Sequence, residues 1–367
     1  MSEERPTPLE RLPVSVITGF LGSGKTTLLK HLLTQDWMAD TAVVINEFGE
    51  VGLDHLLVEA AQEDTILLSS GCLCCTVRGD LVDTLRRLYK RRDRGEIASF
   101  RRVVIETTGL ADPAPILHTL IGDPLLQAFY RLDGVIATVD AVNAMSQFDR
   151  QVESVKQAAM ADRLLLTKCD LADAATIADV RERLQRLNPA APVFEVSHGR
   201  IAAEHIFNAG LYNPERKTLD VQNWLRDEAY LAPENAHDHD HGLHQGHHHG
   251  HAHDRHQALD VNRHDDHIRA FCLIRDEPLD WEKFVDWIEM LTTTRGVDLL
   301  RIKGILNVAG ESAPVAIHGI QHLFHPPVVL PEWPDSDRRS KIVFITRDVD
   351  RAFLDRSLSA FQNEPVA

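Results

Sequence analysis

The stretch VSVITGFLGSGKTTLLKHLL (residues 14–33) decides the fold, because a β-branched apolar run leads through a glycine-rich turn into a helical pattern. The turn matches the spacing G-x-x-x-x-G-K-[ST], and the strand before it and the helix after it are the context of a phosphate-binding loop. Its glycines let backbone N–H groups turn toward phosphate oxygens at the positive end of the helix. We expect Lys25 to reach the β- and γ-phosphates and the Thr26 hydroxyl to bind Mg²⁺. The predicted nucleotide contacts in this loop are Gly19, Gly22, Ser23, Gly24, Lys25, Thr26 and Thr27.

Further short apolar runs alternate with helical patterns along the chain, at residues 41–45, 65–69, 102–106, 134–140, 163–167 and 192–196. Near-continuous apolar strands separated by helices indicate an α/β domain with a mostly parallel sheet covered on both faces. Ligands bind beyond the C-terminal strand ends of such sheets. Functional residues are therefore expected just after each run.

Two strand ends have the character of nucleotide switches. Glu106 ends one run and Gly109 follows three residues later, which suits a Mg²⁺-linked acid and a glycine whose N–H senses the γ-phosphate. Glu47, after the run at 41–45, is a second candidate for the Mg²⁺ shell or for orienting water. Together with Lys25 these two acids form the predicted catalytic set.

The sequence TKCD (167–170) resembles the guanine-reading element N-K-x-D. The Asp170 carboxylate can accept both hydrogen bonds from the N1–H and N2–H₂ edge of guanine, and the Lys168 stem can pack on the base. Adenine lacks those donors. Thr167 stands where the element usually has Asn, and EVSHG (195–199) falls where a last base-contacting loop is expected.

The composition bounds the class of protein. With 367 residues, 44% of them hydrophobic, the chain can form two domains with sizeable cores, and its net charge is −16. Nucleic-acid and anionic-membrane binders need a basic face, so neither partner is expected. The acidic N-terminus lacks the apolar segment of a secretory signal, and no run approaches the roughly 18 apolar residues of a membrane helix. We expect a cytoplasmic protein whose thiols stay reduced.

Cys72, Cys74 and Cys75 are three of only five cysteines, and we expect them in a glycine-flanked turn after the run at 65–69. A disulfide, a set of buried core residues and a metal site are the three interpretations. A reduced compartment and the strain of bonding adjacent cysteines weaken the first. Free cysteines are often simply buried, but three soft thiolates in a turn beside a nucleotide loop favour a metal ion.

Residues 229–267 carry 12 of the 20 histidines. Their Asp, Gly and His content cannot support a packed core, so we predict a flexible linker between a first domain at 1–228 and a second at 268–367. Histidine tracts bind metal weakly, and we favour metal collection or buffering over a pure spacer.

Beyond the linker, apolar runs and one amphipathic stretch at 280–294 indicate a smaller α+β C-terminal domain with an antiparallel sheet and a helix or two on one face. Trp281, Phe284 and Trp287 are expected in the core on the helix face. No catalytic constellation stands out in this domain, and we interpret it as a site where a partner docks.

Five motifs in this order resemble those of the CobW family of metal-linked P-loop GTPases: GFLGSGKTTLL (19–29), NEFGEVGLD (46–54), GCLCC (71–75), ETTGLADP (106–113) and TKCD (167–170). GCLCC is the most specific of them. RIKGILNVAG, AIHGIQHLF and RRSKIVFITRDVD resemble the smaller C-terminal module of that family. The resemblance covers most of the chain.

The resemblance implies a Mg²⁺-dependent GTPase that cycles between GTP and GDP, binds Zn²⁺ at Cys72, Cys74 and Cys75, and delivers it to a client metalloprotein. Three protein ligands leave one tetrahedral position of Zn²⁺ open for handover. A cobalt-handling GTPase serving cobalamin synthesis and a non-catalytic metal store based on the histidine tract remain alternatives. We expect nucleotide state and metal affinity to be coupled, because the cysteine turn and the phosphate loop should open on one edge of the sheet.

Overall fold

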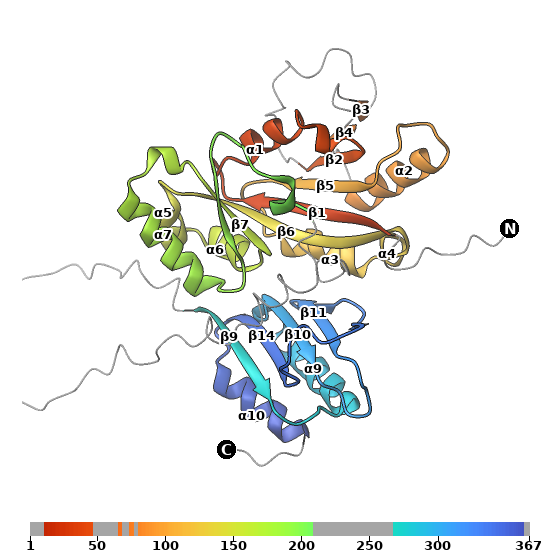
Figure 1. The fold of residues 1–367 in the computed structure, drawn as a ribbon, viewed down its shortest axis with the longest axis vertical. Helices are drawn as coiled ribbons and strands as arrows, with labels where there is room; N and C mark the ends of the chain where they lie inside the picture. The colour runs from red at the N-terminus through yellow and green to blue at the C-terminus, as the bar shows by residue number, and fades with distance from the viewer. Residues whose placement is uncertain (1–10, 47–64, 68–72, 77–79, 208–266, 363–367) are drawn as a thin grey trace, which may run out of the picture.

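A computed structural model of the chain describes residues 11–46, 65–67, 73–76, 80–207 and 267–362. These residues form two units, each built on its own sheet, and the C-terminal unit lies below the larger one in Figure 1. Glu47, Cys72 and the histidine tract through residue 266 lie outside the described residues. The predicted domain boundary at 228/229 falls there too and stays a prediction.

The N-terminal domain contains an eight-stranded sheet with the order β3-β4-β2-β5-β1-β6-β7-β8. Every pairing in it is parallel except that of β3 with β4, which confirms the predicted α/β class. The strands are β1 (Leu12–Gly19), β2 (Thr41–Asn46), β3 (Thr65–Leu67), β4 (Leu73–Thr76), β5 (Arg102–Thr107), β6 (Tyr130–Asp140), β7 (Arg163–Thr167) and β8 (Val193–Val196).

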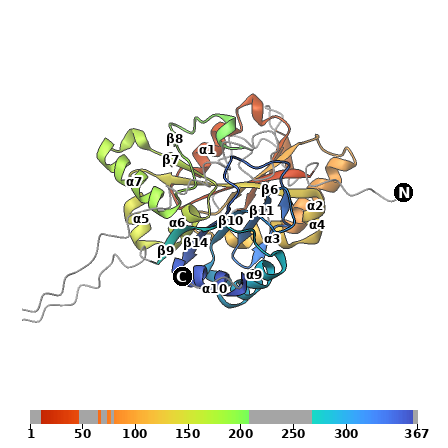
Figure 2. The same ribbon diagram turned by 60° about the horizontal axis from the view of Figure 1, so that its bottom comes forward.

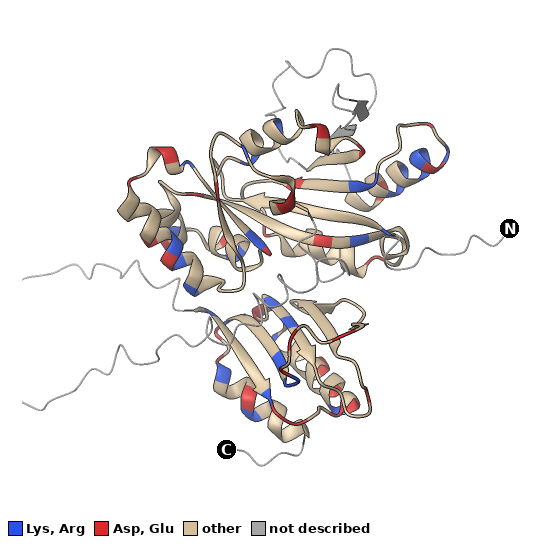
Figure 3. Ribbon diagram, viewed as in Figure 1, with Lys and Arg blue, Asp and Glu red and all other residues tan. Residues whose placement is uncertain are grey.

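Helices cover both faces of this sheet, because alternate strand residues are apolar on both sides. Val43 and Ile45 pack in one cluster with α1, whereas Ala42 and Val44 pack in another with the helices from α2 to α7. Basic residues gather on α2, which carries three of them in its last turn (Figure 3). The helices are α1 (Lys25–Leu32), α2 (Leu81–Asp93), α3 (Ala114–Gly122), α4 (Pro124–Phe129), α5 (Ala144–Arg150), α6 (Val152–Ala159) and α7 (Ala174–Leu187), with short 3-10 turns at Asp36–Met38, Cys169–Leu171 and Ala203–His205.

The region around the cysteines differs from the expectation. We expected a parallel strand at 65–69 and then a turn, but β3, of which the structure describes Thr65–Leu67, forms an antiparallel pair with β4 at the sheet edge. Cys74 and Cys75 lie within β4, so the prediction of a turn at these two positions is wrong. The reason is that four residues without apolar periodicity carry no local strand signal, and pairing with β2 makes them a strand.

The C-terminal domain is an antiparallel sheet with α9 and α10 packed on one side, as predicted. Phe284 and Trp287 of α9 are buried against Phe344 in its core, and Trp281 is partly buried there. The elements are β9 (Ile268–Arg275), α9 (Trp281–Arg295), a 3-10 turn at Gly296–Asp298, β10 (Arg301–Leu306), β11 (Val315–Ile320), β12 (Leu323–Phe324), β13 (Val328–Val329), β14 (Ser340–Arg347) and α10 (Arg351–Gln362).

The two domains share a hydrophobic interface. Figures 1 and 2 show the C-terminal sheet facing the larger domain, with α9 and α10 on its far side. Ile268, Ile320 and Ile345 of this sheet, together with Leu300, belong to the same buried cluster as the helices beneath the large sheet. Among the described residues, every helix is too short or too polar to span a bilayer.

Candidate functional site

The loop between β1 and α1 has the backbone that its glycines permit. Gly22 and Gly24 have φ angles of 73° and 93°, in the left-handed region that favours glycine, and Gly24 is the N-cap of α1. The buried Lys25 ammonium donates to the carbonyl oxygens of Gly19 at 2.7 Å and Phe20 at 3.2 Å, so it lies across the loop. Thr26, the next residue, is exposed in the first turn of the helix.

Thr138 of β6 holds this phosphate-binding loop from the neighbouring strand. Its hydroxyl shares a 2.6 Å hydrogen bond with the Ser23 hydroxyl, and both side chains are buried. A Cβ at Gly19 would lie 2.5 Å from the Thr138 carbonyl oxygen, so only glycine fits there. Sequence reasoning missed Thr138, because a threonine inside an apolar strand gives no local sign of a contact 115 residues away.

The segment that begins at the last residue of β5, here called the switch loop (residues 107–112), packs against the phosphate-binding loop. A Cβ at Gly109 would lie 2.8 Å from the Leu21 backbone nitrogen, which makes glycine necessary at this approach. The Thr107 hydroxyl donates to the Thr18 hydroxyl at 2.9 Å and ties the loop to β1. Glu106 is buried at the end of β5, level with Ile17 of β1.

The predicted base-reading segment is also tied to the phosphate-binding loop. Thr167 donates its hydroxyl to the carbonyl oxygens of Ser23 at 2.7 Å and Val139 at 3.1 Å. A threonine therefore supports both loops at the position where the guanine-reading element usually has asparagine. Asp170 is exposed in the short 3-10 turn that follows, beyond the end of β7.

Asp140, which ends β6, fixes the predicted base-packing Lys168. The Asp140 carboxylate is buried and accepts from the Lys168 ammonium at 2.7 Å and the Asn143 amide at 2.8 Å. Burial alone would raise the pKa of Asp140, but these bonds and one from the Val142 N–H outweigh it, so the pKa lies below its ordinary value. An acid at the end of an apolar strand was a signal that could have identified Asp140.

These contacts fit a magnesium–nucleotide complex. Left-handed glycines, a lysine whose ammonium lies across the loop, and a hydroxyl in the first turn of a helix of eight residues are the donor set that phosphate oxygens and Mg²⁺ require. Most of the predicted nucleotide residues are brought to one edge of the sheet by β1, β5 and β7.

The cysteine strand lies two strands from β5, with β2 between them. In the register, Val44 of β2 pairs with Cys75 on one side and Ile105 on the other, and the next residue, Ile45, pairs with Glu106. The Cys75 backbone is therefore one residue short of the level of Glu106. In the part of the chain that the structure describes, no three His, Cys, Asp or Glu side chains are grouped to hold a metal ion.

Comparisons with known proteins extend over both domains. Residues 13–195 match the family model "CobW/HypB/UreG, nucleotide-binding domain", and residues 268–362 match "Cobalamin synthesis protein cobW C-terminal domain". The chain is 35% identical over 334 residues to "Zinc chaperone YjiA" of Escherichia coli (strain K12), which spans 91% of this chain and 93% of that protein. Its fold is similar to the crystal structure of the Zn(II)-bound YjiA GTPase, with a TM-score of 0.69 and 31% identity over 96% of this chain and 99% of that one. "Zinc-regulated GTPase metalloprotein activator 1" of Schizosaccharomyces pombe is 33% identical over 205 residues, 54% of this chain and 49% of that protein.

Proposed function

The chain belongs to the CobW/HypB/UreG family, and from this premise we propose that it hydrolyses GTP and uses the cycle to hand Zn²⁺ to a client metalloprotein. The observation that carries the proposal is the contact between the switch loop and the phosphate-binding loop at Gly109 and Leu21. Two loops in backbone contact at one sheet edge can respond together to the γ-phosphate. Two relatives are named as zinc chaperone and as metalloprotein activator, which supports zinc as the cargo and a metalloprotein as the client.

In this proposal each residue of the nucleotide site has a separate task. The Lys25 ammonium, fixed across its loop, offers its charge to the β- and γ-phosphates. Thr26 and Glu106 would hold Mg²⁺, which when bound neutralises charge between the phosphates. The switch loop would orient the Gly109 N–H toward the γ-phosphate. Glu47 would orient the attacking water or join the Mg²⁺ shell. At the other end, Asp170 accepts from the guanine edge.

Zinc would be held by the thiolates of Cys72, Cys74 and Cys75. Thiolate ligands suit both Zn²⁺ and Co²⁺, so the ligand type does not distinguish the two metals. We choose Zn²⁺ because the relatives are named for zinc. The position of β4 beside β2, whose other neighbour β5 carries Glu106 one residue before its end, supports a coupling between metal and nucleotide. A coupling of about 1–3 kcal/mol changes Zn²⁺ affinity roughly 5- to 150-fold between the GTP and GDP states.

The test is a zinc titration of the protein loaded with GDP and with a non-hydrolysable GTP analogue, paired with GTP turnover measured with and without Zn²⁺. We expect the two nucleotide states to differ in Zn²⁺ affinity, and the variant with Cys74→Ser and Cys75→Ser to lose that difference. Cys272→Ser is the matched control, because Cys272 is buried in β9 of the other domain. Lys25→Ala should abolish turnover while zinc binding without nucleotide survives.

Four results would contradict the proposal. Equal zinc affinities in both nucleotide states would leave a GTPase and a zinc site with no switch between them. Wild-type turnover in Lys25→Ala would remove the phosphate-binding role. Zinc bound only by the histidine tract, with no GTP turnover, would indicate the metal store, and tighter binding of Co²⁺ than of Zn²⁺ in the nucleotide-dependent site would indicate the cobalt-handling alternative.

A further inference from the structure

Two side chains of helix α6 bind the switch loop. The buried Gln157 amide donates to the carbonyl oxygens of Gly109 at 3.2 Å and Ala111 at 2.9 Å. The neighbouring Lys156 ammonium forms a 2.7 Å ion pair with Asp112. Two consecutive side chains of one helix therefore fix three positions of the loop. Because Gln157 binds backbone carbonyls only, it acts on the loop through the orientation of its peptide groups.

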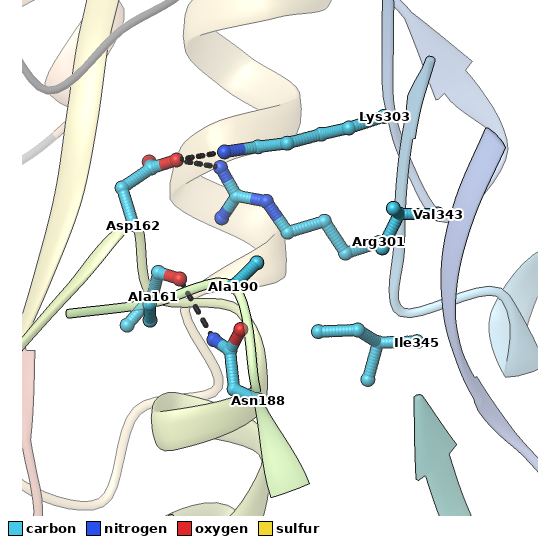
Figure 4. A pocket seen from close by; sticks show the side chains of 9 residues that line it. Ala161, Asp162, Asn188, Ala190, Arg301, Lys303, Val343 and Ile345 are labelled. Carbon is cyan, nitrogen blue, oxygen red and sulfur yellow. Dashed lines mark hydrogen bonds and ion pairs between the residues drawn. The ribbon is translucent and has the colours of Figure 1, made fainter. Parts of the chain in front are cut away.

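The residues that follow α6 are held by the C-terminal domain. Arg301 of β10 donates to the Met160 carbonyl oxygen and to the Asp162 carboxylate, and Lys303 donates to the same carboxylate at 2.5 Å. Figure 4 shows both cations reaching from β10 toward Asp162 beside a small cavity at the interface. The other Asp162 oxygen accepts from the Val135 N–H at 2.8 Å. This buried carboxylate therefore joins β6 of the N-terminal domain to β10 of the C-terminal domain.

Asn188 stabilises the C-terminal end of α6, which lies between the contacts with the switch loop and the contacts with β10. Its amide donates to the carbonyl oxygens of Ala158, Ala159 and Ala161, at 2.9, 3.1 and 2.8 Å. The Met160 N–H continues the helical pattern to the Lys156 carbonyl at 2.9 Å. Residues 156–162 are therefore one hydrogen-bonded unit, with the switch loop bound at one end and Arg301 at the other.

We propose that Gln157 is a positioning residue for the switch loop, and that Arg301 and Lys303 hold the unit that carries it, so that the C-terminal domain sets the rate of GTP turnover. The proposal rests on the GTPase function proposed above. A shift of the C-terminal domain moves Met160 and Asp162, the unit transmits it, and the Gly109 and Ala111 carbonyls follow. A client that docks on the C-terminal domain can act on the nucleotide site by this route.

Gln157→Leu tests the positioning role. The Gln157 side-chain oxygen is buried and has no hydrogen-bond partner among the described residues, so leucine leaves no orphaned side-chain group of its own. We expect the thermal midpoint to fall modestly, because the Gly109 and Ala111 carbonyl oxygens lose their donor. The KM for GTP should stay within about threefold of wild type and kcat should fall about tenfold, because an interaction made through the switch loop is lost in the transition state. A kcat at the wild-type value overturns the positioning role.

Arg301→Met tests the link between the domains. We expect kcat to fall about 2- to 30-fold, the range of couplings carried by residues that touch neither ligand. Arg301→Lys keeps a cation near Asp162 but cannot bind Met160 and Asp162 together, so its kcat should be intermediate. Arg275→Met is the matched control, because this buried arginine of β9, in the same sheet, donates to Asp355 and Ser359 of α10.

Hydrogen exchange of residues 107–112 separates this inference from the function on which it rests. Faster exchange there in Arg301→Met, and unchanged exchange in Arg275→Met, would support the link even for a protein that turns over no GTP. If the wild-type protein turned over no GTP, the proposed function would be contradicted, whereas the link between the domains would not. Unchanged exchange and kcat in Arg301→Met, or equal losses in Arg275→Met, would overturn the link, since the second result indicates general destabilisation.

Discussion

The ion pair between Asp140 and Lys168 gives the sharpest energetic test of the nucleotide edge. The perturbation is a double-mutant cycle of Asp140→Asn and Lys168→Met, read by urea unfolding. Asp140 is 1% exposed and the Lys168 side chain is 33% exposed, with 2.7 Å between the charged atoms. The cycle measures their interaction energy free of the other contacts that each side chain makes.

The magnitude follows from burial. A hydrogen bond to a charged group contributes about 1.5–3 kcal/mol, whereas an exposed ion pair contributes about 0.2–1 kcal/mol. Because one partner is buried and the other is partly solvated, we expect a coupling of about 1–2 kcal/mol between the two charges.

The matched control is the ion pair of Arg181 with Glu195. Its distance is 2.6 Å, but its side chains are 39% and 52% exposed, so its coupling should stay below about 1 kcal/mol. Since the two pairs have similar N···O distances and differ in burial, a coupling at Asp140 no larger than that at Glu195 would refute the reasoning. GTP affinity should fall in Asp140→Asn as well, because the stem of Lys168 loses its anchor.

Three further predictions address base choice, pH and the histidine tract. Asp170→Asn should weaken GTP binding by about 1–3 kcal/mol, and equal wild-type affinities for ATP and GTP would contradict the base-reading role. Burial, with Arg301 adding to it, lowers the pKa of His325 from 6.5 to about 4, so the unfolded chain binds a proton that the folded one does not. Unfolding at pH 6.5 and 5 should therefore show about 1.5 kcal/mol lost on acidification through this residue, and His325→Gln should remove that share of the loss. Deleting residues 237–256 should lower the number of weakly bound Zn²⁺ ions while the tight site and GTP turnover persist, and loss of the tight site would show that a histidine belongs to it.

Local patterns predicted the scaffold well. The phosphate-binding loop combines a strand, glycines and a helix start within 20 residues, and short-range chemistry fixes such a segment wherever it occurs. The runs at 102–106 and 163–167 were placed to within a residue of β5 and β7, since buried parallel strands read as continuous apolar segments. The same logic predicted the antiparallel C-terminal sheet.

The cysteine region shows where local patterns fail. The sequence GCLCC predicts a turn because its glycine and cysteines show no apolar periodicity. The structure instead pairs residues 73–76 with β2 on one side and β3 on the other. Strand pairing of so short a segment is decided by its neighbours in the sheet, which are distant in sequence. The predicted roles of Cys72, Cys74, Cys75 and Glu47 stay predictions.

By itself, the sequence determined that this chain builds a nucleotide-binding α/β domain followed by an α+β domain, because period, glycine placement and strand length are local properties. Only the tertiary structure decided which side chains support the site. Thr138 reaches Ser23 across 115 residues, Thr167 reaches the same residue across 144, and Arg301 reaches Asp162 across 139. Each of these polar groups is buried, and a buried polar group is stable only with a partner. Such partners come together only when the chain is packed, so no local sequence pattern predicts them.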